Sequence, residues 1–173
     1  MKTKLLSIAT MLLMSVTAFA QENEKKCELN HAFGFNVGST TGIGLSYQLW
    51  HKQKCALQLT AGPRITNEND QYLNFGLGGI YKLRDRNRVD FLTYGGVNFI
   101  HTRGIEYDYS GPYYGNNSYI KTTNQVNVGA GIGFEFNLAG DFYVNAMGGF
   151  GAYSTNNRWS LLPAGEISLF YKL

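Results

Sequence analysis

The stretch Val126–Phe136, VNVGAGIGFEF, alternates between two kinds of residue along its whole length. Every second position is apolar: Val126, Val128, Ala130, Ile132, Phe134 and Phe136. The positions between them carry only Asn, Gly or Glu. Successive side chains of a β-strand point to opposite faces of the sheet, so a period of two predicts a strand with one apolar face. The architecture then depends on which face meets water.

The same alternation recurs along most of the chain and predicts eight strands in all. The other seven segments are His31–Gly38, Ile43–Trp50, Cys55–Arg64, Tyr72–Leu83, Val89–His101, Phe142–Tyr153 and Glu166–Leu173. The segment Val89–His101 is the least regular, because Leu92 and Ile100 fall on the face opposite to its other large apolar residues. No segment after residue 20 has a helical period, so we expect an all-β chain.

The connections between the predicted strands alternate in kind. Short polar turns follow the second, fourth and sixth strands, at residues 51–54, 84–88 and 139–141. The connections after the odd-numbered strands are residues 39–42, 65–71, 102–124 and 154–160, and only the first of these is as short as the turns. Tight turns at one rim and longer loops at the other are typical of an up-and-down barrel.

The composition of the two faces indicates which one meets water. An eight-stranded barrel has an interior only just wide enough to be filled by side chains, and the apolar face carries more large residues than such an interior holds. The other face is rich in Gly and Asn and has few charges, which suits a packed interior better than a soluble exterior. We therefore predict that the apolar face meets lipid. The fold class is then a closed eight-stranded antiparallel up-and-down transmembrane β-barrel, because a bilayer tolerates only sheets that close.

This orientation assigns individual side chains to the two faces. The tyrosines Tyr47, Tyr81 and Tyr171 would face outward near the short-turn rim, where an aromatic girdle is expected. The charged residues predicted to face the lumen, close enough in places to pair, are Arg64, Lys82, Glu135, Glu166 and Lys172. Bulky residues predicted to point inward beside the glycines are Trp50, Tyr72, Tyr94 and Phe170.

The first twenty residues have the pattern of a cleaved signal peptide. Lys2 and Lys4 precede an apolar run, which ends in the small-x-small sequence 18–20, AFA. We therefore divide the chain into a signal peptide (residues 1–20), a periplasmic N-terminal segment (21–30) and the barrel (31–173). Removal of the two lysines leaves 13 basic and 12 acidic residues, a net charge of +1. No basic cluster tracks one face, so no nucleic-acid partner is expected.

The last strand carries a local family resemblance. In GEISLFYKL, residues 165–173, apolar residues alternate up to Leu173, with an aromatic at Tyr171. This pattern resembles the terminal strand of small eight-stranded outer-membrane barrels, the OmpA transmembrane domain and OmpX-like proteins, although those usually end in Phe or Trp. The resemblance implies an integral outer-membrane protein with periplasmic N- and C-termini. It also implies outer-membrane lipid as surroundings and the barrel assembly machinery as a partner during biogenesis.

Catalytic and metal-binding patterns are weak. Some outer-membrane barrels that deacylate lipid A carry a Ser two residues after a His, whereas His101 is followed by Thr102 and Arg103. His31 and His51 lie near strand ends without an evident nucleophile. No Cys/His spacing fits zinc. We therefore expect no enzymatic activity and no cofactor or metal. A lipid-modifying enzyme remains an alternative function.

The connection 102–124 contains the most distinctive group of side chains, five tyrosines among Gly, Asn and Ser. They are Tyr107, Tyr109, Tyr113, Tyr114 and Tyr119. Tyr offers a large amphipathic contact area at low entropic cost, so this composition suits an extracellular binding surface. Alternatively, the flanking strands extend beyond the membrane as a hairpin, with tyrosines packed across it.

The two cysteines, Cys27 and Cys55, both map to the short-turn rim. An exported chain enters an oxidising compartment, so a disulfide between them is a candidate and two free thiols are the alternative.

Together these observations favour a non-enzymatic outer-membrane barrel with a structural or interaction role. It would display its longer loops or serve as a subunit of a larger envelope complex, and another outer-membrane protein would pack on small residues of its wall. These residues are Ala61, Ala130, Ala146 and Gly148. A narrow pore is a further alternative, although eight strands leave no wide channel.

Overall fold

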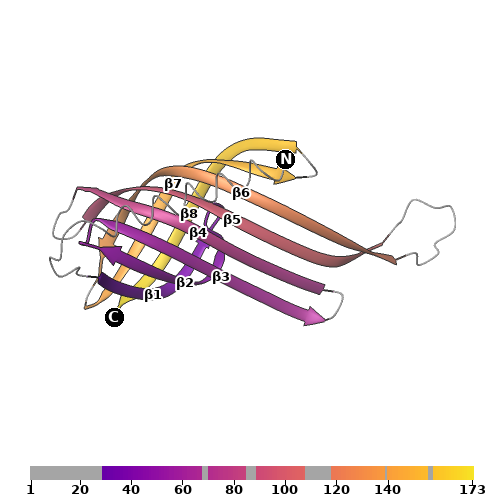
Figure 1. Ribbon diagram of the computed structural model, residues 1–173, viewed down its shortest axis with the longest axis horizontal. Helices are drawn as coiled ribbons and strands as arrows, with labels where there is room; N and C mark the ends of the chain where they lie inside the picture. Colours follow the sequence, from indigo (N-terminus) through magenta and orange to yellow (C-terminus); the bar gives the residue numbers. More distant parts are fainter. Residues whose placement is uncertain (1–28, 68–69, 85–88, 108–117, 139, 156–157) are drawn as a thin grey trace, which may run out of the picture.

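The computed structural model describes residues 29–67, 70–84, 89–107, 118–138, 140–155 and 158–173, with only the backbone at 64–67, 84, 106–107, 118 and 155. Within these ranges no helix is long and apolar enough to span a membrane. The described chain consists of eight strands (Figure 1). The strands are β1 (Leu29–Gly38), β2 (Ile43–His51), β3 (Cys55–Asn67), β4 (Asp70–Arg84), β5 (Val89–Tyr107), β6 (Ser118–Asn137), β7 (Phe142–Thr155) and β8 (Arg158–Lys172).

The eight strands form a closed antiparallel barrel in sequence order, with β8 paired to β1. The register fixes the tilt of the strands. Starting at Ala32 in β1 and moving from each residue to its partner on the next strand, from β2 round to β8, one arrives at Leu162. The direct partner of Ala32 on β8 is Lys172. The sheet therefore closes with a displacement of ten residues, and such a stagger requires strands that are tilted against the barrel axis. The predicted fold class is confirmed.

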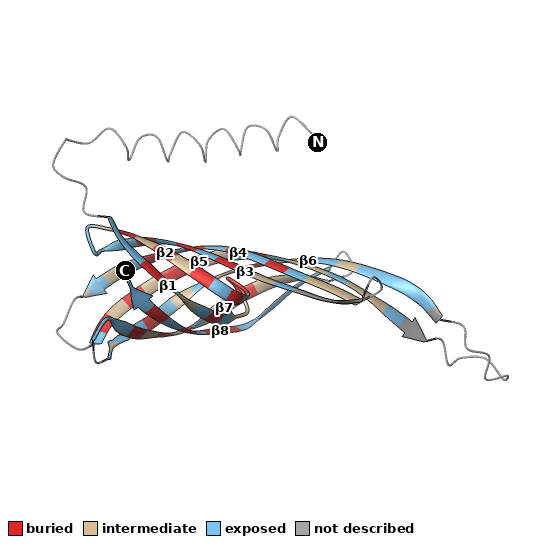
Figure 2. Cartoon of the chain, turned by 90° about the horizontal axis from the view of Figure 1, so that it is seen from below, coloured by how far each residue is buried: buried red, intermediate tan, exposed pale blue. Residues whose placement is uncertain are grey.

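Burial alternates along the strands in the predicted sense (Figure 2). In β2 the buried positions are Gly44, Ser46, Gln48 and Trp50, and the large apolar side chains Ile43 and Leu45 are exposed. The same inversion holds in β8, where Ile167 and Leu169 are exposed and Glu166 and Ser168 are buried. An apolar outside, a polar inside and a closed ladder are the properties of a transmembrane β-barrel.

The irregular pattern of Val89–His101 has a structural explanation. Leu92 and Tyr94 of β5 point inward and are buried, whereas Val97 and Phe99 face outward. Leu92 belongs to an inward apolar cluster with Trp50 and Ile80, so an inward Leu fits there.

Three predicted connections are much shorter in the structure than in the sequence-based assignment. β5 and β6 continue to the pair Tyr107↔Ser118, β7 and β8 to Thr155↔Arg158, and β3 and β4 to Asn67↔Asp70. The predictions placed these segments in loops at 102–124, 154–160 and 65–71. Beyond the membrane both faces of a strand meet water, so the apolar alternation that marks a strand is lost there. β1 also begins two residues before the predicted boundary, at Leu29.

The lipid-facing surface provides a direct test of the orientation. Val97 and Val89 lie on the same face of β5 and are 38% and 37% exposed, but Val97 lies well inside the strand and Val89 is its first residue. We expect Val97→Arg to lower the free energy of unfolding in lipid vesicles by about 2–4 kcal/mol and Val89→Arg by about 0–1 kcal/mol, because the cost of a cation depends on its depth in the bilayer. Urea titration measures both values, and equal costs would contradict the orientation.

Candidate functional site

The interior near the short-turn rim is closed by an aromatic layer. The buried residues of this layer are Ala32, Trp50, Ala56, Ile80, Leu92, Tyr94, Tyr143, Met147 and Phe170. Tyr143 and Phe170 stack with ring centroids 5.5 Å apart. Trp50 Nε1 donates hydrogen bonds to Gln48 Oε1 at 3.0 Å and to Tyr143 OH at 3.2 Å, so the polar edges of these two rings are satisfied.

An ion cluster lies at the mouth beside this layer. Lys82 Nζ is 2.8 Å from Asp90 Oδ2 and 2.6 Å from Glu135 Oε1, and it lies 4.7 Å from the centre of the Trp50 ring. Both carboxylates are buried. Lys172 lies over the Tyr143 ring at 5.2 Å and donates to Asn137. The cluster borders a cavity of about 180 Å³ at the short-turn rim, which Glu135, Lys82 and Trp50 line.

The predicted inward positions of Lys82, Glu135 and Glu166 are confirmed, and so is the expectation that inward charges pair. The side chain of Arg64 is outside the described part of the chain. Sequence reasoning missed Asp90, which follows the turn after β4. It meets Lys82 through the register of β4 and β5, which no local pattern encodes.

The turn between β1 and β2, residues 39–42, folds into the barrel instead of standing above it. The side chains of Thr40 and Thr41 are fully or almost fully buried. Thr40 Oγ1 donates to Glu166 Oε2 at 3.0 Å, and Thr41 Oγ1 donates to Glu166 Oε1. Gln58 Nε2 donates to the same carboxylate at 3.3 Å. We call Thr40 and Thr41 the plug. Nothing in the sequence pattern indicates that this short turn points inward.

Inward-facing glycines make the space that the plug occupies. A Cβ at Gly76 would lie 1.8 Å from Thr41 O, and one at Gly129 would lie 2.2 Å from Thr40 Cγ2. A Cβ at Gly96 would lie 2.5 Å from Thr41 Cγ2. Three different strands therefore leave out a side chain where the plug fits. The prediction that inward glycines make room for bulky groups is confirmed. These groups include the turn at residues 39–42 as well as aromatic side chains.

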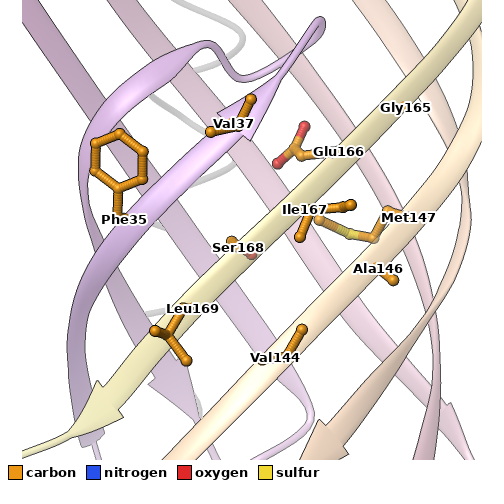
Figure 3. A pocket seen from close by; sticks show the side chains of 10 residues that line it. All are labelled: Phe35, Val37, Val144, Ala146, Met147, Gly165, Glu166, Ile167, Ser168 and Leu169. Carbon is orange, nitrogen blue, oxygen red and sulfur yellow. The ribbon is translucent and has the colours of Figure 1, made fainter.

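The lipid-facing wall has a shallow apolar groove where the first and last strands meet (Figure 3). Its volume is about 790 Å³. The apolar side chains along it are Phe35 and Val37 of β1, Val144 and Ala146 of β7, and Ile167 and Leu169 of β8. Ala146, one of the predicted small wall positions, belongs to it, and a Cβ at the nearby Gly148 would meet nothing within 4 Å.

At the opposite rim, β5 and β6 project beyond the other strands (Figure 1). β5 pairs with β4 only as far as Arg103, and β6 pairs with β7 only from Asn127. The two strands nevertheless pair with each other to Tyr107↔Ser118. We call residues 104–107 and 118–126 the arm. Its outward face carries Ile105 and Ile120, which are directly opposite each other and both exposed.

The predicted tyrosine surface falls partly on the arm. Tyr107 is the last residue of β5, and Tyr119 lies on β6 with 52% of its surface exposed. Tyr109, Tyr113 and Tyr114 lie outside the described residues, so their role stays a prediction. The alternative interpretation of this segment, a strand extension, is confirmed for its two ends.

The histidines do not come together. His101 Nδ1 lies 2.7 Å from Asn124 Oδ1 on the exterior of the arm's base, and His31 Nδ1 lies 2.5 Å from Tyr47 OH at the other rim. Among the residues that the structure describes, no three His, Cys, Asp or Glu side chains form a group suited to a metal. His31 and His101 therefore each take part in a side-chain hydrogen bond with a neighbouring residue.

The sequence matches no known protein family and no curated protein. Solved structures similar to the fold include the N-terminal β-barrel domain of Pseudomonas aeruginosa OprF, at 12% identity and a TM-score of 0.48, covering 84% of this chain and 96% of that one. They also include the attachment invasion locus protein Ail of Yersinia pestis, at 12% identity and a TM-score of 0.43, with coverages of 85% and 99%. Neisserial surface protein A matches at 13% identity and a TM-score of 0.35, with coverages of 84% and 94%.

The ion cluster yields a stability prediction. Lys82→Met would leave Asp90 and Glu135 buried without their cation, and breaking a buried pair in this way costs about 3–5 kcal/mol. The matched change Lys172→Met removes an exposed cation–π contact and an exposed hydrogen bond to Asn137, and it should cost about 0.5–1 kcal/mol. Urea unfolding in vesicles compares the two, and similar losses would show that the cluster does not hold the barrel.

The disulfide stays a prediction. Cys55 is the first residue of β3 and is exposed at the short-turn rim, and Cys27 lies outside the described residues. We expect protein isolated from the envelope to show no reactive thiol when it is denatured without reductant. Two thiols per chain in that titration would exclude the bond.

Proposed function

We propose that this protein is a non-enzymatic integral outer-membrane β-barrel that presents its arm to a binding partner outside the membrane. The observation that carries the proposal is the length of β5 and β6, 19 and 20 residues, against 10 and 9 residues for β1 and β2. Spanning a bilayer needs about 9–11 tilted residues. The additional pairs are therefore not needed to cross the membrane.

The surface of the arm supports a binding role. Ile105, Ile120 and Tyr119 are exposed on a segment that stands in water, where exposed apolar and aromatic side chains are typical of interaction sites. On the side of β6 that faces β7, residues 118–126 have no paired strand within the described part of the chain. A strand edge of this kind can pair with an extended segment of a partner, which adds main-chain hydrogen bonds to side-chain contacts.

The second candidate role is that of a subunit in a larger envelope complex. The groove between β1, β8 and β7 favours it, because small residues let the wall of another barrel approach closely. In both roles the short-turn rim, where β1 begins and β8 ends, would face the periplasm. Insertion by the barrel assembly machinery and surroundings of outer-membrane lipid belong to the same proposal.

Removal of the outer part of the arm, which carries Ile105, Tyr119 and Ile120, tests the proposal. Gly104 pairs with Lys121, so residues 105–120 can be replaced by Asn-Gly, which favours a two-residue hairpin turn. The membrane part should still fold, shown by a heat-dependent shift in gel mobility. A stoichiometric partner that co-purifies from solubilised membranes with the intact protein should be lost with the shortened one.

Trp159→Ala serves as the control, because Trp159 is an exposed aromatic residue at the same rim on β8. It should retain the partner. A partner that stays bound to the shortened barrel would favour the wall groove instead, and absence of any partner from the intact protein would contradict both roles.

A further inference from the structure

The barrel wall is open on one side at its outer end, because β1 and β2 are shorter than the strands that flank them. β8 pairs with β1 as far as Gly38↔Glu166 and then continues to Arg158. β3 likewise continues beyond Ala61, its last residue paired with β2. Two strand spacings without a strand leave an opening about 10 Å wide. We call this gap the side opening. Within the described part of the chain it is bounded by residues 158–165 of β8 and 62–67 of β3.

The side opening lies at the level of the bilayer. Beside it, Leu161 of β8 points outward with 74% of its surface exposed, and Trp159 is exposed two residues further out. Outward apolar residues mark the part of a strand that meets hydrocarbon, and an aromatic residue marks the interface. Leu162, on the inward side of β8, is 52% exposed, whereas the next inward residue, Ala164, is buried. The apolar surface therefore continues from the outer wall into the opening.

Two of the three prolines of the chain stand at the two edges of the opening. The N–H and C=O of one residue in an antiparallel ladder point to the same neighbour, and alternate residues point to opposite sides. Gly165 exchanges hydrogen bonds with Ser39 on the β1 side, so Pro163 also faces the opening, without an N–H. Pro63 lies two residues beyond the last β3–β2 pair. Proline at a sheet edge prevents the addition of a strand, so an extended peptide is a poor occupant.

Pro163 also makes this edge compatible with hydrocarbon. A backbone group left unpaired in lipid is costly, and the N–H is the group that proline lacks. Deeper in the wall, Gly165 is already bonded to Ser39. The next N–H that points into the opening is that of Leu161, which lies near Trp159 at the interface, where water and lipid headgroups supply partners. The deeper part of the β8 edge therefore presents no unpaired donor.

The side opening is continuous with the apolar groove on the outer wall. Gly165 lines the upper end of the groove, where β1 ends (Figure 3). A Cβ at Gly165 or at its partner Gly148 on β7 would meet nothing within 4 Å, so nothing separates the opening from the groove. The groove volume of about 790 Å³ is within the range of small-molecule sites. The open edge of β8 adds a track about 23 Å long, which suits a long chain.

We propose that the side opening and the groove bind one acyl chain of an anionic lipid from the leaflet on the side of the arm. The chain lies along the edge of β8 where β1 no longer covers it, and its end rests in the groove between Phe35 and Ile167. The headgroup lies beside Arg158 at the outer end of β8. This site is separate from the arm and does not depend on the partner proposed for it.

The charge of the track supports this occupant. Residues 158–165, RWSLLPAG, contain one charged residue, Arg158, which is exposed at the headgroup level. A basic side chain at a membrane surface attracts anionic lipid, and the absence of acidic residues from this stretch leaves that attraction unopposed. The remaining side chains are apolar or small except Ser160. One end of the track therefore fits an anionic headgroup and the rest fits hydrocarbon.

The test counts lipids on the delipidated barrel by native mass spectrometry in detergent, with phosphatidylglycerol as the probe. Gly165→Leu blocks the passage between the opening and the groove, and Gly79→Leu adds the same side chain on the lipid face of β4, where a Cβ also meets nothing within 4 Å. We expect the first lipid to bind wild type and Gly79→Leu about tenfold more tightly than later lipids, and Gly165→Leu to lose this difference.

Equal constants for the first and later lipids on wild type would overturn the proposal, and so would equal behaviour of the two leucine variants. Folding of each variant is checked by the heat-dependent shift in gel mobility. If Gly165→Leu does not fold, Gly148→Leu blocks the same passage from the facing strand and takes its place. A second copy of the barrel that occupies the wall in place of the first lipid would also overturn the proposal.

A second pair of variants tests the headgroup position. Arg158→Gln should remove the preference of the first site for phosphatidylglycerol over phosphatidylcholine, because it removes the cation beside the headgroup. Arg103→Gln makes the same change on β5 at the same rim, away from the opening, and should keep the preference. Equal effects of the two changes, or no preference in wild type, would overturn the assignment of Arg158.

Discussion

The structure depends on one constraint: inside hydrocarbon, every backbone N–H and C=O must find its partner within the protein. A sheet meets this condition only when its last strand pairs with its first, as β8 does with β1. Closure at a displacement of ten residues then fixes the tilt and the width together. The apolar outside, the polar inside and the alternation along each strand follow, because one face of a closed sheet meets lipid and the other faces the barrel interior.

Closure also creates an interior of fixed volume, which this chain fills in two ways. Near the short-turn rim, large rings fill it, with Trp50 and Tyr143 bonded to each other. Further along the axis, glycines replace side chains and the turn after β1 fills the space they leave. The plug also ties the chain after β1 to β8 through Glu166, so the interior contact reinforces the ladder that closes the barrel.

The sequence predicts the parts of the structure that the bilayer dictates. Strand existence, the facing of Glu135 and Lys82, and the order of the connections could all be predicted, because lipid on one side imposes a period of two. Above the membrane that asymmetry disappears, so the ends of β5 and β6 carry no alternating pattern and the sequence predicts a loop there. Contacts that depend on register, such as Lys82 with Asp90, or on the direction of a turn, such as Thr41 with Glu166, have no periodic signal.

The polar interior has a physical cost that calls for an explanation. Buried ion pairs such as Lys82–Glu135 often contribute less stability than apolar residues of the same volume. A barrel filled with apolar side chains would, however, have strands that are apolar on both faces. Such segments aggregate in water and resemble helical membrane spans, whereas an outer-membrane chain must first cross an aqueous compartment. Inward Asn, Gln and Glu keep each strand half polar until closure hides that face, so the same residues that make the interior costly keep the unfolded chain soluble.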